Sequence, residues 1–496
     1  MELKQAVEKL KTLQATMHAY SHAMGILYYD ARTAAPSDTE DGRGETLSVL
    51  SAAQYELFIN PETDEMLTCL EANKDQLTFA QNRQTELLRR DYRKMCCVPQ
   101  DEYVAFEKLI NKAETVWHNA KENNDFASFA PYIEQIVATQ KKFAGYFDPT
   151  KDPYDVQLDD HEPGMTRSVL DAFFAALRSE IVPLLERVKD KQSAVRDDFL
   201  FREYPADQQR KLAERLMEIM GIDKRHCTLG ETLHPFTTNF NNKDVRITTN
   251  YDEHSLASSL YSVVHEGGHA LYELNSGDDL EFTCLAGGVS MGIHESQSRF
   301  YENILGRSRA FVSVIYPICR EIFPEQLADV TEDELYAAVN KSVPSLIRTE
   351  ADELTYCLHV MVRYEIEKGL FDGSIAVADL PRIWAEKMKE YLGVEVPDDT
   401  HGVLQDSHWS GGDFGYFPSY AVGSAYGAQI AAKVGETLDL DACIRGGRIP
   451  EITAKLSDGI YRFGRLYDPA VLLQNFCGAP FDPKFYTDYL KGKYEG

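Results

Sequence analysis

Residues 263–274 read VVHEGGHALYEL and contain two histidines four positions apart, His265 and His269. On an α-helix, residues at this spacing lie on the same face, so both imidazoles can bind one metal ion. Glu266 can reach a water molecule on that ion, which is the chemistry typical of the H-E-x-x-H pattern. The two glycines between the histidines each cost a helix about 1 kcal/mol relative to alanine. They therefore indicate a place where another backbone or a substrate comes close.

A hydrolytic metal site usually has three protein ligands and one open position, so a third ligand is expected outside this segment. The next stretch with suitable side chains is GIHESQSRFYE, residues 292–302, which we expect on a following helix. It offers His294 and Glu295. Because neighbouring helix positions lie about 100° apart, only one of the two can face the ion. The spacing alone leaves both open.

The hydrophobic pattern around these segments predicts a mainly helical protein with a little sheet. In the first half of the chain, apolar residues recur at spacings of three and four, as in SVLDAFFAALRSEIVPLLERV, residues 168–188. The best strand candidate is DVRITTNY, residues 244–251, which is rich in β-branched side chains. Further helices are expected over residues 252–274, 290–305 and 348–368, and loops over residues 401–426.

Two smaller groups of polar residues accompany these elements. The tripeptide His-Pro-Phe at 234–236 precedes the strand candidate, whose Asp244 and Arg246 can form a surface ion pair or contact a substrate. Arg348 and Asp352 lie four apart at a helix start. This spacing fits an ordinary i,i+4 salt bridge, or a guanidinium that Asp352 holds in place to bind a carboxylate.

Residues 402–423, GVLQDSHWSGGDFGYFPSYAVG, are dense in glycine and aromatic side chains. Loops of this composition are more often functional than mere connections. Gln405, Asp406, His408, Tyr416 and Tyr420 all lie within it. A histidine or tyrosine from such a loop can donate a hydrogen bond to an oxyanion.

The composition excludes several classes of protein. The chain has 496 residues, 44% of them hydrophobic and 26% charged, which is typical of a folded globular protein. A formal net charge of -28 with no basic stripe argues against binding to nucleic acid. No run of about 18 apolar residues predicts a membrane span, and the charged start MELKQAVEKLKT is unlike a signal peptide. Nine scattered cysteines are typical of reduced thiols, so we expect a cytoplasmic protein.

Taken together, these blocks resemble the M32 family of metallocarboxypeptidases, the thermostable carboxypeptidase or carboxypeptidase Taq type. The resemblance covers the C-terminal half in family order, and the helical first half and the length also agree with it. The matching blocks are HPF at 234–236, DVRIT at 244–248, HEGGH at 265–269, HESQS at 294–298, IRTEADELTY at 347–356 and GVLQDSHW at 402–409.

The resemblance implies a role for each of these blocks. His265, His269 and Glu295 match the metal ligands, which favours Glu295 over His294, and Glu266 matches the general base. Arg348 matches the residue that holds the carboxylate of the substrate. His408 and Tyr420 match the donors to the tetrahedral intermediate, with Tyr416 as the alternative tyrosine. The expected substrate-binding residues are, besides Arg348, His234, Asp244, Arg246, Gln405 and Asp406.

The family also implies a fold and a function. We expect a mainly α, two-lobed molecule with a deep central groove and a small β-sheet near the active site, similar to neurolysin and angiotensin-converting enzyme. Residues 1–230 would form a helical half, 231–430 the metal and substrate core, and 431–496 a helical end of one peptidase unit. The predicted activity is release of single C-terminal amino acids from peptides that have a free carboxylate.

The family further implies one divalent metal per subunit, zinc or cobalt, and a homodimer. Nucleic acid and membranes are not expected as partners. Two alternatives stay open from the residues alone. The first is a metallo-oligopeptidase that cuts inside peptides, and the second is a non-catalytic helical scaffold.

Overall fold

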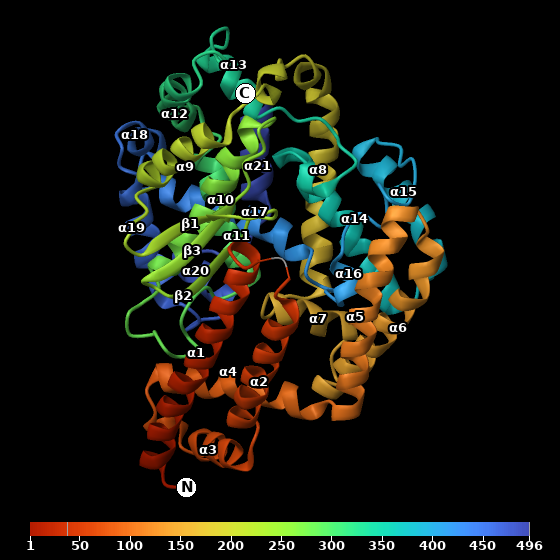
Figure 1. Ribbon diagram of the computed structural model, residues 1–496, viewed down its shortest axis with the longest axis vertical. Coiled ribbons are helices and arrows are strands. Elements are labelled where there is room, and N and C mark those ends of the chain that lie inside the picture. The colour runs from red at the N-terminus through yellow and green to blue at the C-terminus, as the bar shows by residue number, and fades with distance from the viewer. Residues whose placement is uncertain (37, 496) are drawn as a thin grey trace.

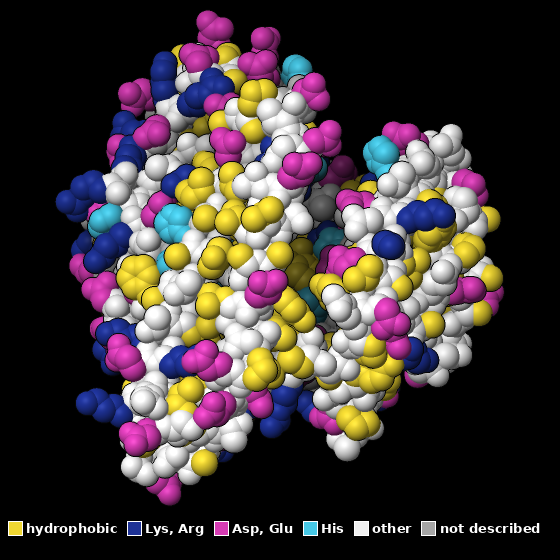
Figure 2. Space-filling model, turned by 60° about the horizontal axis from the view of Figure 1, so that its bottom comes forward, with side chains coloured by type: hydrophobic (Ala, Val, Ile, Leu, Met, Phe, Trp, Pro, Cys, Tyr) yellow, Lys and Arg dark blue, Asp and Glu magenta, His cyan; other side chains and the backbone are white. Residues whose placement is uncertain are grey.

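The computed structural model describes residues 1–36 and 38–495. Positions 37 and 496, which belong to the predicted segments 1–230 and 431–496, lie outside the described residues. The fold is mainly α, and its helices are arranged in two lobes (Figure 1). The space-filling view shows a deep cleft between the lobes, with histidine side chains visible inside it (Figure 2). The predicted fold class is therefore confirmed.

Helices make up almost all of the first 220 residues. α1 to α4 lie together at the N-terminal end of the molecule, whereas α5 to α8 belong to the lobe that also contains α15 and α16 (Figure 1). The helices are α1 Leu3–Thr33, α2 Glu40–Phe58, α3 Pro61–Ala72, α4 Phe79–Cys97, α5 Gln100–Asn123, α6 Phe126–Phe147, α7 Pro153–His161, α8 Arg167–Ser193 and α9 Ala206–Met220.

A sheet of three short strands follows, in the order β1-β3-β2. β1 (Cys227–Glu231) is parallel to β3 (Asp244–Thr249), and β2 (Thr237–Asn241) is antiparallel to it. The sequence predicted only β3, because CTLGE and TTNFN are short and lack a clear alternation of apolar and polar residues. The metal motif lies on the helix that packs across β2 and β3, so the sheet is next to it, as predicted.

The remaining chain is helical again. The α-helices are α10 Leu256–Leu274, α11 Met291–Arg299, α12 Arg309–Ile322, α13 Glu332–Val339, α14 Glu353–Asp372, α15 Leu380–Leu392, α16 His408–Gly411, α17 Pro418–Gly435, α18 Leu440–Arg445, α19 Ile449–Gly459, α20 Pro469–Cys477 and α21 Lys484–Glu495. The shorter 3-10 segments are η1 Lys74–Gln76, η2 Asp198–Phe201, η4 Arg348–Glu350, η5 Val377–Asp379 and η6 Tyr461–Phe463, and the π segment is η3 Phe300–Leu305.

Two of the expected helix starts lie a few residues too early. The N-cap of α10 is Ser255, whose side chain accepts a hydrogen bond from the Ser258 N–H, and not Asp252. Asp352 caps α14, so that helix begins at residue 353 and not at 348. In both places, a side-chain oxygen that satisfies free N–H groups of the first turn fixes the start of the helix.

The expected loop over residues 401–426 is wrong in its second half, because α17 begins at Pro418. Most of the helix is buried, with small residues on every side. A helix that is buried all round shows no amphipathic period, and its glycines are typical of loops. Both features conceal it in the sequence.

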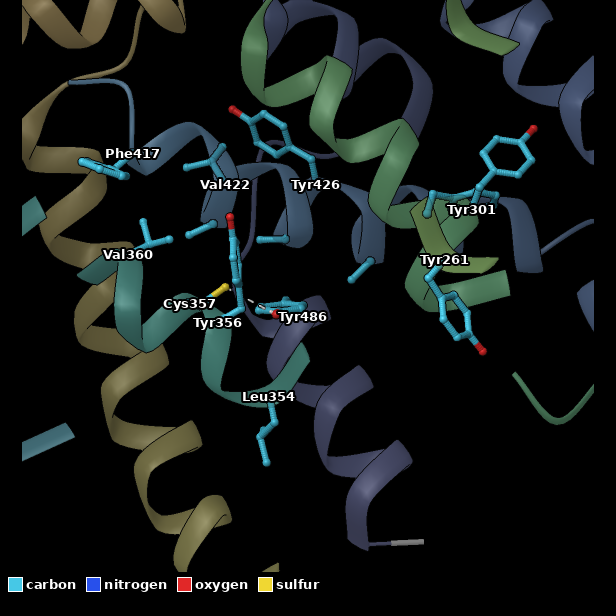
Figure 3. Packing of buried hydrophobic residues seen from close by; sticks show 14 of the residues in the cluster. Tyr261, Tyr301, Leu354, Tyr356, Cys357, Val360, Phe417, Val422, Tyr426 and Tyr486 are labelled. Atoms are coloured by element: carbon cyan, nitrogen blue, oxygen red, sulfur yellow. Dashed lines mark hydrogen bonds between the residues drawn. The ribbon is translucent and has the colours of Figure 1, made fainter. Parts of the chain in front are cut away.

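One large hydrophobic core joins elements from α5 to α21, and a smaller one lies between α1, α2, α3 and α4. Figure 3 shows part of the large core, where Tyr486 of α21 lies beside Cys357 of α14, with 3.4 Å between the hydroxyl oxygen and the sulfur. The C-terminal helix therefore closes the core that holds α14 and α17.

The two glycines of the HEGGH segment lie where α10 meets its neighbours most closely. A Cβ atom on Gly268 would lie 2.8 Å from the carbonyl oxygen of Gln297 and 2.8 Å from the Cα of Ser298, both on α11. On Gly267 it would lie 2.7 Å from the end of the Met220 side chain. Gly268 therefore lets the backbones of α10 and α11 touch, as the glycine pair predicted.

We expect Gly268→Ala to lower the stability of the protein, because α11 would have to move away from α10. Overpacking of this kind costs about 1–3 kcal/mol. Gly145→Ala is the matched control, because Gly145 is also inside a helix but has nothing within 4 Å of an added Cβ. Removing that glycine should stabilise the protein by about 0.5–1 kcal/mol. Thermal unfolding of both variants measures the difference, and equal midpoints would contradict the close contact.

Candidate metal centre and active site

Three side chains with metal-binding atoms converge between α10 and α11. His265 and His269 come from α10 and Glu295 from α11, and one ligand atom from each lies within 4.8 Å of the other two. Glu295 Oε2 is 3.7 Å from His265 Nε2 and 3.6 Å from His269 Nε2. The structure thus brings Glu295, and not His294, into the cluster.

The cluster fits a tetrahedral divalent metal. Bonds of about 2.0–2.1 Å from zinc to nitrogen and oxygen place neighbouring ligand atoms roughly 3.3–3.4 Å apart. The two observed distances from Glu295 are close to that value. Two imidazoles and one carboxylate are also the donor set of hydrolytic zinc sites that keep a fourth position open.

Polar and charged side chains around the cluster form hydrogen bonds to its three members. Glu302 Oε2 lies 2.9 Å from His265 Nδ1, and Arg299 Nε donates to Glu295 Oε1 over 2.7 Å. On the other side, His294 Nδ1 lies 2.6 Å from His269 Nδ1, and the far nitrogen of His294 meets Glu273 Oε1 at 2.7 Å. Such partners fix the orientation of metal-binding imidazoles and carboxylates.

The electrostatics of the cluster favour a bound cation. Burial disfavours the charged form of Glu295, but Arg299 and the imidazoles outweigh it and hold the pKa of this carboxyl well below its usual value. Burial, together with His294 and His265, lowers the pKa of His269 to about 3, so its imidazole is neutral. Burial would also lower the pKa of His265, but Glu295 and Glu302 raise it overall. An ionised carboxylate beside neutral imidazole nitrogen is what a divalent metal binds.

Glu266, the predicted base, lies beside the metal ligands at the edge of the sheet. Its side chain is buried, and its Oε2 accepts a hydrogen bond of 2.6 Å from the hydroxyl of Thr237 on β2. Burial raises the pKa of Glu266 above its ordinary value. A carboxylate with a raised pKa is a better proton acceptor at neutral pH, and Thr237 fixes one of its oxygens.

Arg348 does not pair with Asp352, so the contact with Asp352 that both interpretations of that spacing assumed is wrong. Arg348 donates instead to Asp406 Oδ1, with distances of 3.1 Å from Nε and 2.9 Å from Nη2, and from Nη1 to the Tyr356 hydroxyl at 3.0 Å. Asp352 is occupied as the N-cap of α14, where it accepts from Leu354 and Thr355.

A second arginine lies on the other side of Asp406. The Nε of Arg363 on α14 donates to Asp406 Oδ2 over 2.7 Å, and Gln405 Oε1 accepts from the Arg348 backbone at 3.0 Å and from Arg363 Nη2 at 2.8 Å. Arg348 is 6% and Arg363 0% exposed. Two buried guanidinium groups therefore share one carboxylate, which leaves one positive charge without a counter-charge in this group.

His408, Tyr416 and Tyr420 form an aromatic group next to Arg348. The His408 ring centroid lies 5.4 Å from that of Tyr416 and 6.4 Å from that of Tyr420, and the Arg348 guanidinium carbon lies 5.1 Å from the Tyr420 ring. Burial, followed by the two arginines, lowers the pKa of His408 to about 4, and burial raises the pKa of Tyr420. All three are therefore neutral hydrogen-bond donors at neutral pH.

The remaining predicted residues lie on the sheet or next to it. Arg246 donates to both oxygens of Asp244 at 2.9 and 3.0 Å, and its guanidinium covers the rings of Phe240 and Tyr29 at 4.7 and 5.2 Å. His234 is exposed between β1 and β2. The Asp244–Arg246 pair joins α1 to the sheet and is not in the group around Arg348.

Several residues of the site escaped the sequence analysis. Arg299 and Glu302 follow Glu295 by four and seven positions, so helical spacing could have found them. Glu273 follows His269 by four positions on α10, so the same spacing could have found it as well. Thr237 and Arg363 carry no such signal. They reach the site only because the chain returns to it from distant segments.

Comparisons with known proteins agree with this geometry. The family model for carboxypeptidase Taq (M32) metallopeptidases matches residues 9–494. The chain belongs to the M32 family. The prediction of a metallocarboxypeptidase, which is a peptide hydrolase that uses a divalent metal, is thereby confirmed.

Relatives in the M32 family match over nearly the whole length. Carboxypeptidase 1 of Bacillus subtilis is 38% identical over 495 residues, which are 100% of this chain and 99% of that protein. Thermostable carboxypeptidase 1 of Pyrococcus furiosus is 32% identical over 497 residues, covering 99% and 98% of the two chains. The crystal structure of the M32 carboxypeptidase from Deinococcus radiodurans R1 superposes with a TM-score of 0.96, at 35% identity and 99% coverage of both chains.

We expect Glu302→Gln to weaken metal binding, because His265 would lose the carboxylate that orients it. Loss of such a partner typically costs about 10- to 100-fold in metal affinity. Glu353→Gln is the control, since the Glu353 side chain is also shielded from water and paired with a cation, Lys493, but does not contact the proposed metal ligands. Competition with a chromophoric chelator measures both affinities, and an unchanged affinity for the Glu302 variant would contradict the proposed support of His265.

Proposed function

We propose that this chain removes single amino acids from the C-termini of peptides, with its divalent metal held by His265, His269 and Glu295. The observation that supports this most directly is the position of the buried Arg348–Asp406–Arg363 group. This group lies beside the aromatic donors. The Tyr356 hydroxyl accepts a hydrogen bond from Arg348, and the guanidinium of Arg299 lies over the Tyr356 ring at 4.6 Å. Arg299 in turn donates a hydrogen bond to Glu295. This positively charged group is thus connected to the proposed metal ligands through one tyrosine.

Zinc is the metal that the two imidazoles and one carboxylate favour, and cobalt suits the same donors. When bound, such a metal polarises the peptide carbonyl and makes a water molecule more acidic. The residues of the chain carry out the proton transfers. Glu266 accepts a proton from the attacking water and later returns it to the leaving amine.

His408 and Tyr420 are proposed to stabilise the oxyanion that develops on the carbonyl oxygen. Both are half-buried and neutral, so they donate hydrogen bonds without adding charge of their own. Tyr416 lies 5.3 Å from Tyr420 between ring centroids and is the alternative donor. Substitution of each tyrosine by phenylalanine separates the two roles through kcat.

Arg348 is proposed to bind the terminal carboxylate of the substrate. Asp406 and Tyr356 hold the guanidinium, and Gln405 holds the backbone of Arg348. Because Arg348 and Arg363 share only one carboxylate, a substrate carboxylate would supply the missing negative charge. His234, Asp244 and Arg246 would contact the peptide from the sheet side of the cleft.

The wider setting is also part of the proposal. All nine cysteines are free, which supports a reducing compartment such as the cytoplasm. In the part of the chain that the structure describes, no helix is both long enough and apolar enough to cross a membrane. The family resemblance supports a homodimer, and light scattering of the purified protein tests it.

Neither the oligopeptidase nor the non-catalytic scaffold is favoured, because the family is one of carboxypeptidases. A timed digestion of a defined peptide, analysed by mass spectrometry, distinguishes the activities. Release of one residue after another from the C-terminus supports the proposal. Internal fragments would support the oligopeptidase, and an unchanged peptide in the presence of zinc or cobalt would support the scaffold.

We expect Glu266→Gln to bind metal normally but to lose at least about 100-fold in kcat, because the amide cannot accept the proton of the water. Metal content and steady-state kinetics give the two readings. Retained turnover with a full complement of metal would exclude Glu266 as the base.

We expect Arg348→Ala to raise the KM for peptides with a free C-terminal carboxylate by about 10- to 100-fold, the value of a lost charge-assisted hydrogen bond. Cleavage of C-terminally amidated peptides, slow in both proteins, should change little. Arg348→Lys keeps the charge but not the planar guanidinium, so its KM for these peptides should lie between those of the natural protein and Arg348→Ala. Equal losses on free and amidated peptides would argue against recognition of the carboxylate.

A further inference from the structure

α7 contributes no metal ligand and no proposed donor, yet it contacts both halves of the site. It lies in the N-terminal half of the chain and ends at His161, and Glu162 follows it directly before a tight turn at Gly164, where φ is +86°. The metal ligand Glu295 and the donors His408 and Tyr420 come from the C-terminal half. Contacts with α7 therefore join two distant parts of the chain.

On the metal side, Glu162 holds the first turn of α11. Its side chain is 4% exposed, and its Oε2 accepts a hydrogen bond of 2.7 Å from the Gly292 N–H. Gly292 lies three residues before Glu295, and its N–H is one of the groups that a helix start leaves unpaired. A Cβ on Gly292 would lie 2.6 Å from that same oxygen, so the glycine permits the contact.

On the donor side, Glu367 of α14 holds the segment between His408 and Tyr416. It accepts hydrogen bonds from the Trp409 indole at 2.8 Å and from the Gly415 N–H at 2.9 Å, at the two ends of that segment. The third bond to Glu367, 2.8 Å long, comes from the Tyr154 hydroxyl in the first turn of α7. Glu367 is 0% exposed, so all three bonds are shielded from water.

α7 also touches this donor segment directly. A Cβ on Gly415, where φ is +77°, would lie 2.8 Å from the carbonyl carbon of Gln157 in α7. Near the end of α7, the His161 ring meets the Tyr416 ring edge-on with 5.1 Å between centroids. The helix thus runs along the donor segment before it reaches α11.

We propose that Glu162 and Glu367 are positioning residues that act on separate halves of the reaction: Glu162 places the helix of the metal ligand Glu295, and Glu367 places the donors His408 and Tyr420. This inference rests on the proposed function. It assigns a role to two buried carboxyls that touch neither the metal ligands nor the donors themselves.

The two residues are matched controls for each other. Both are buried, burial raises the pKa of each to about 7, and each accepts a hydrogen bond from a glycine N–H. A purely structural role predicts the same functional loss when either is truncated. Distinct positioning roles predict different losses.

The experiment compares Glu162→Ala and Glu367→Ala in the full-length protein. Zinc affinity is measured by competition with a chelator, the absorption spectrum of the cobalt-loaded protein reports ligand geometry, and kcat and KM are measured at saturating zinc. For Glu162→Ala we expect about a 10- to 100-fold loss of zinc affinity and a changed cobalt spectrum, with activity restored as zinc is raised. Glu162→Gln should recover most of the affinity, because its amide oxygen can accept the Gly292 N–H.

For Glu367→Ala we expect zinc affinity within about threefold of the natural protein and an unchanged cobalt spectrum. Its kcat should fall about 10- to 100-fold, because displaced donors no longer meet the oxyanion. Should an alanine variant fail to fold, Gly292→Ala displaces the Glu162 carboxyl on the metal side, and Tyr154→Phe removes one of the three hydrogen bonds to Glu367 on the donor side.

Parallel losses of zinc affinity and kcat in both variants, or no loss in either, would overturn the assignment. Failure of the proposed function gives a different result. The natural protein would then bind zinc but release no C-terminal residue, while the zinc affinity of Glu162→Ala would still report on the metal half.

Discussion

The close contact between α10 and α11 is the constraint on which the candidate metal site depends. Gly268 lets the two helix backbones touch, and this contact fixes how far Glu295 lies from the two histidines. α17 also packs closely on α11, where a Cβ on Gly423 would lie 2.6 Å from the Cβ of Glu295. Since packed helices cannot shift by a fraction of an ångström without new clashes, these two close contacts make the arrangement of the three side chains rigid.

Charge balance explains why so many ionised groups are buried around this contact. A buried ion pair seldom adds stability, because the loss of hydration offsets the attraction between the charges. Here the carboxylates of Glu295 and Glu302 are paired with Arg299 and Arg307 beside the imidazole of His265, whereas Arg348 and Arg363 share the carboxylate of Asp406. The protein retains both groups at the expense of stability.

Local patterns in the sequence predicted much of this arrangement. The helical period predicted that His265 and His269 share one face of a helix, and the strand period predicted the strand at 244–249. The order of the motif blocks identified the family. The patterns failed where tertiary contacts outweigh local preference. α17 is buried on all sides and has no polar face to reveal its period. β1 and β2 are too short and polar to stand out, and gain their structure from pairing with β3.

The partner of Arg348 shows why a local rule can choose the wrong residue. The i,i+4 spacing favours Asp352, but that carboxylate already accepts hydrogen bonds from the N–H groups of Leu354 and Thr355 and from the hydroxyl of Ser342. A side chain that caps a helix points along its axis toward free N–H groups, so it cannot also turn back to a preceding arginine. Arg348 is then left to a carboxylate 58 positions away, Asp406. At a helix start, a carboxylate that caps the helix is not free to pair with a nearby arginine. The fold therefore decides which acid orients Arg348, and that acid, Asp406, is distant in the sequence.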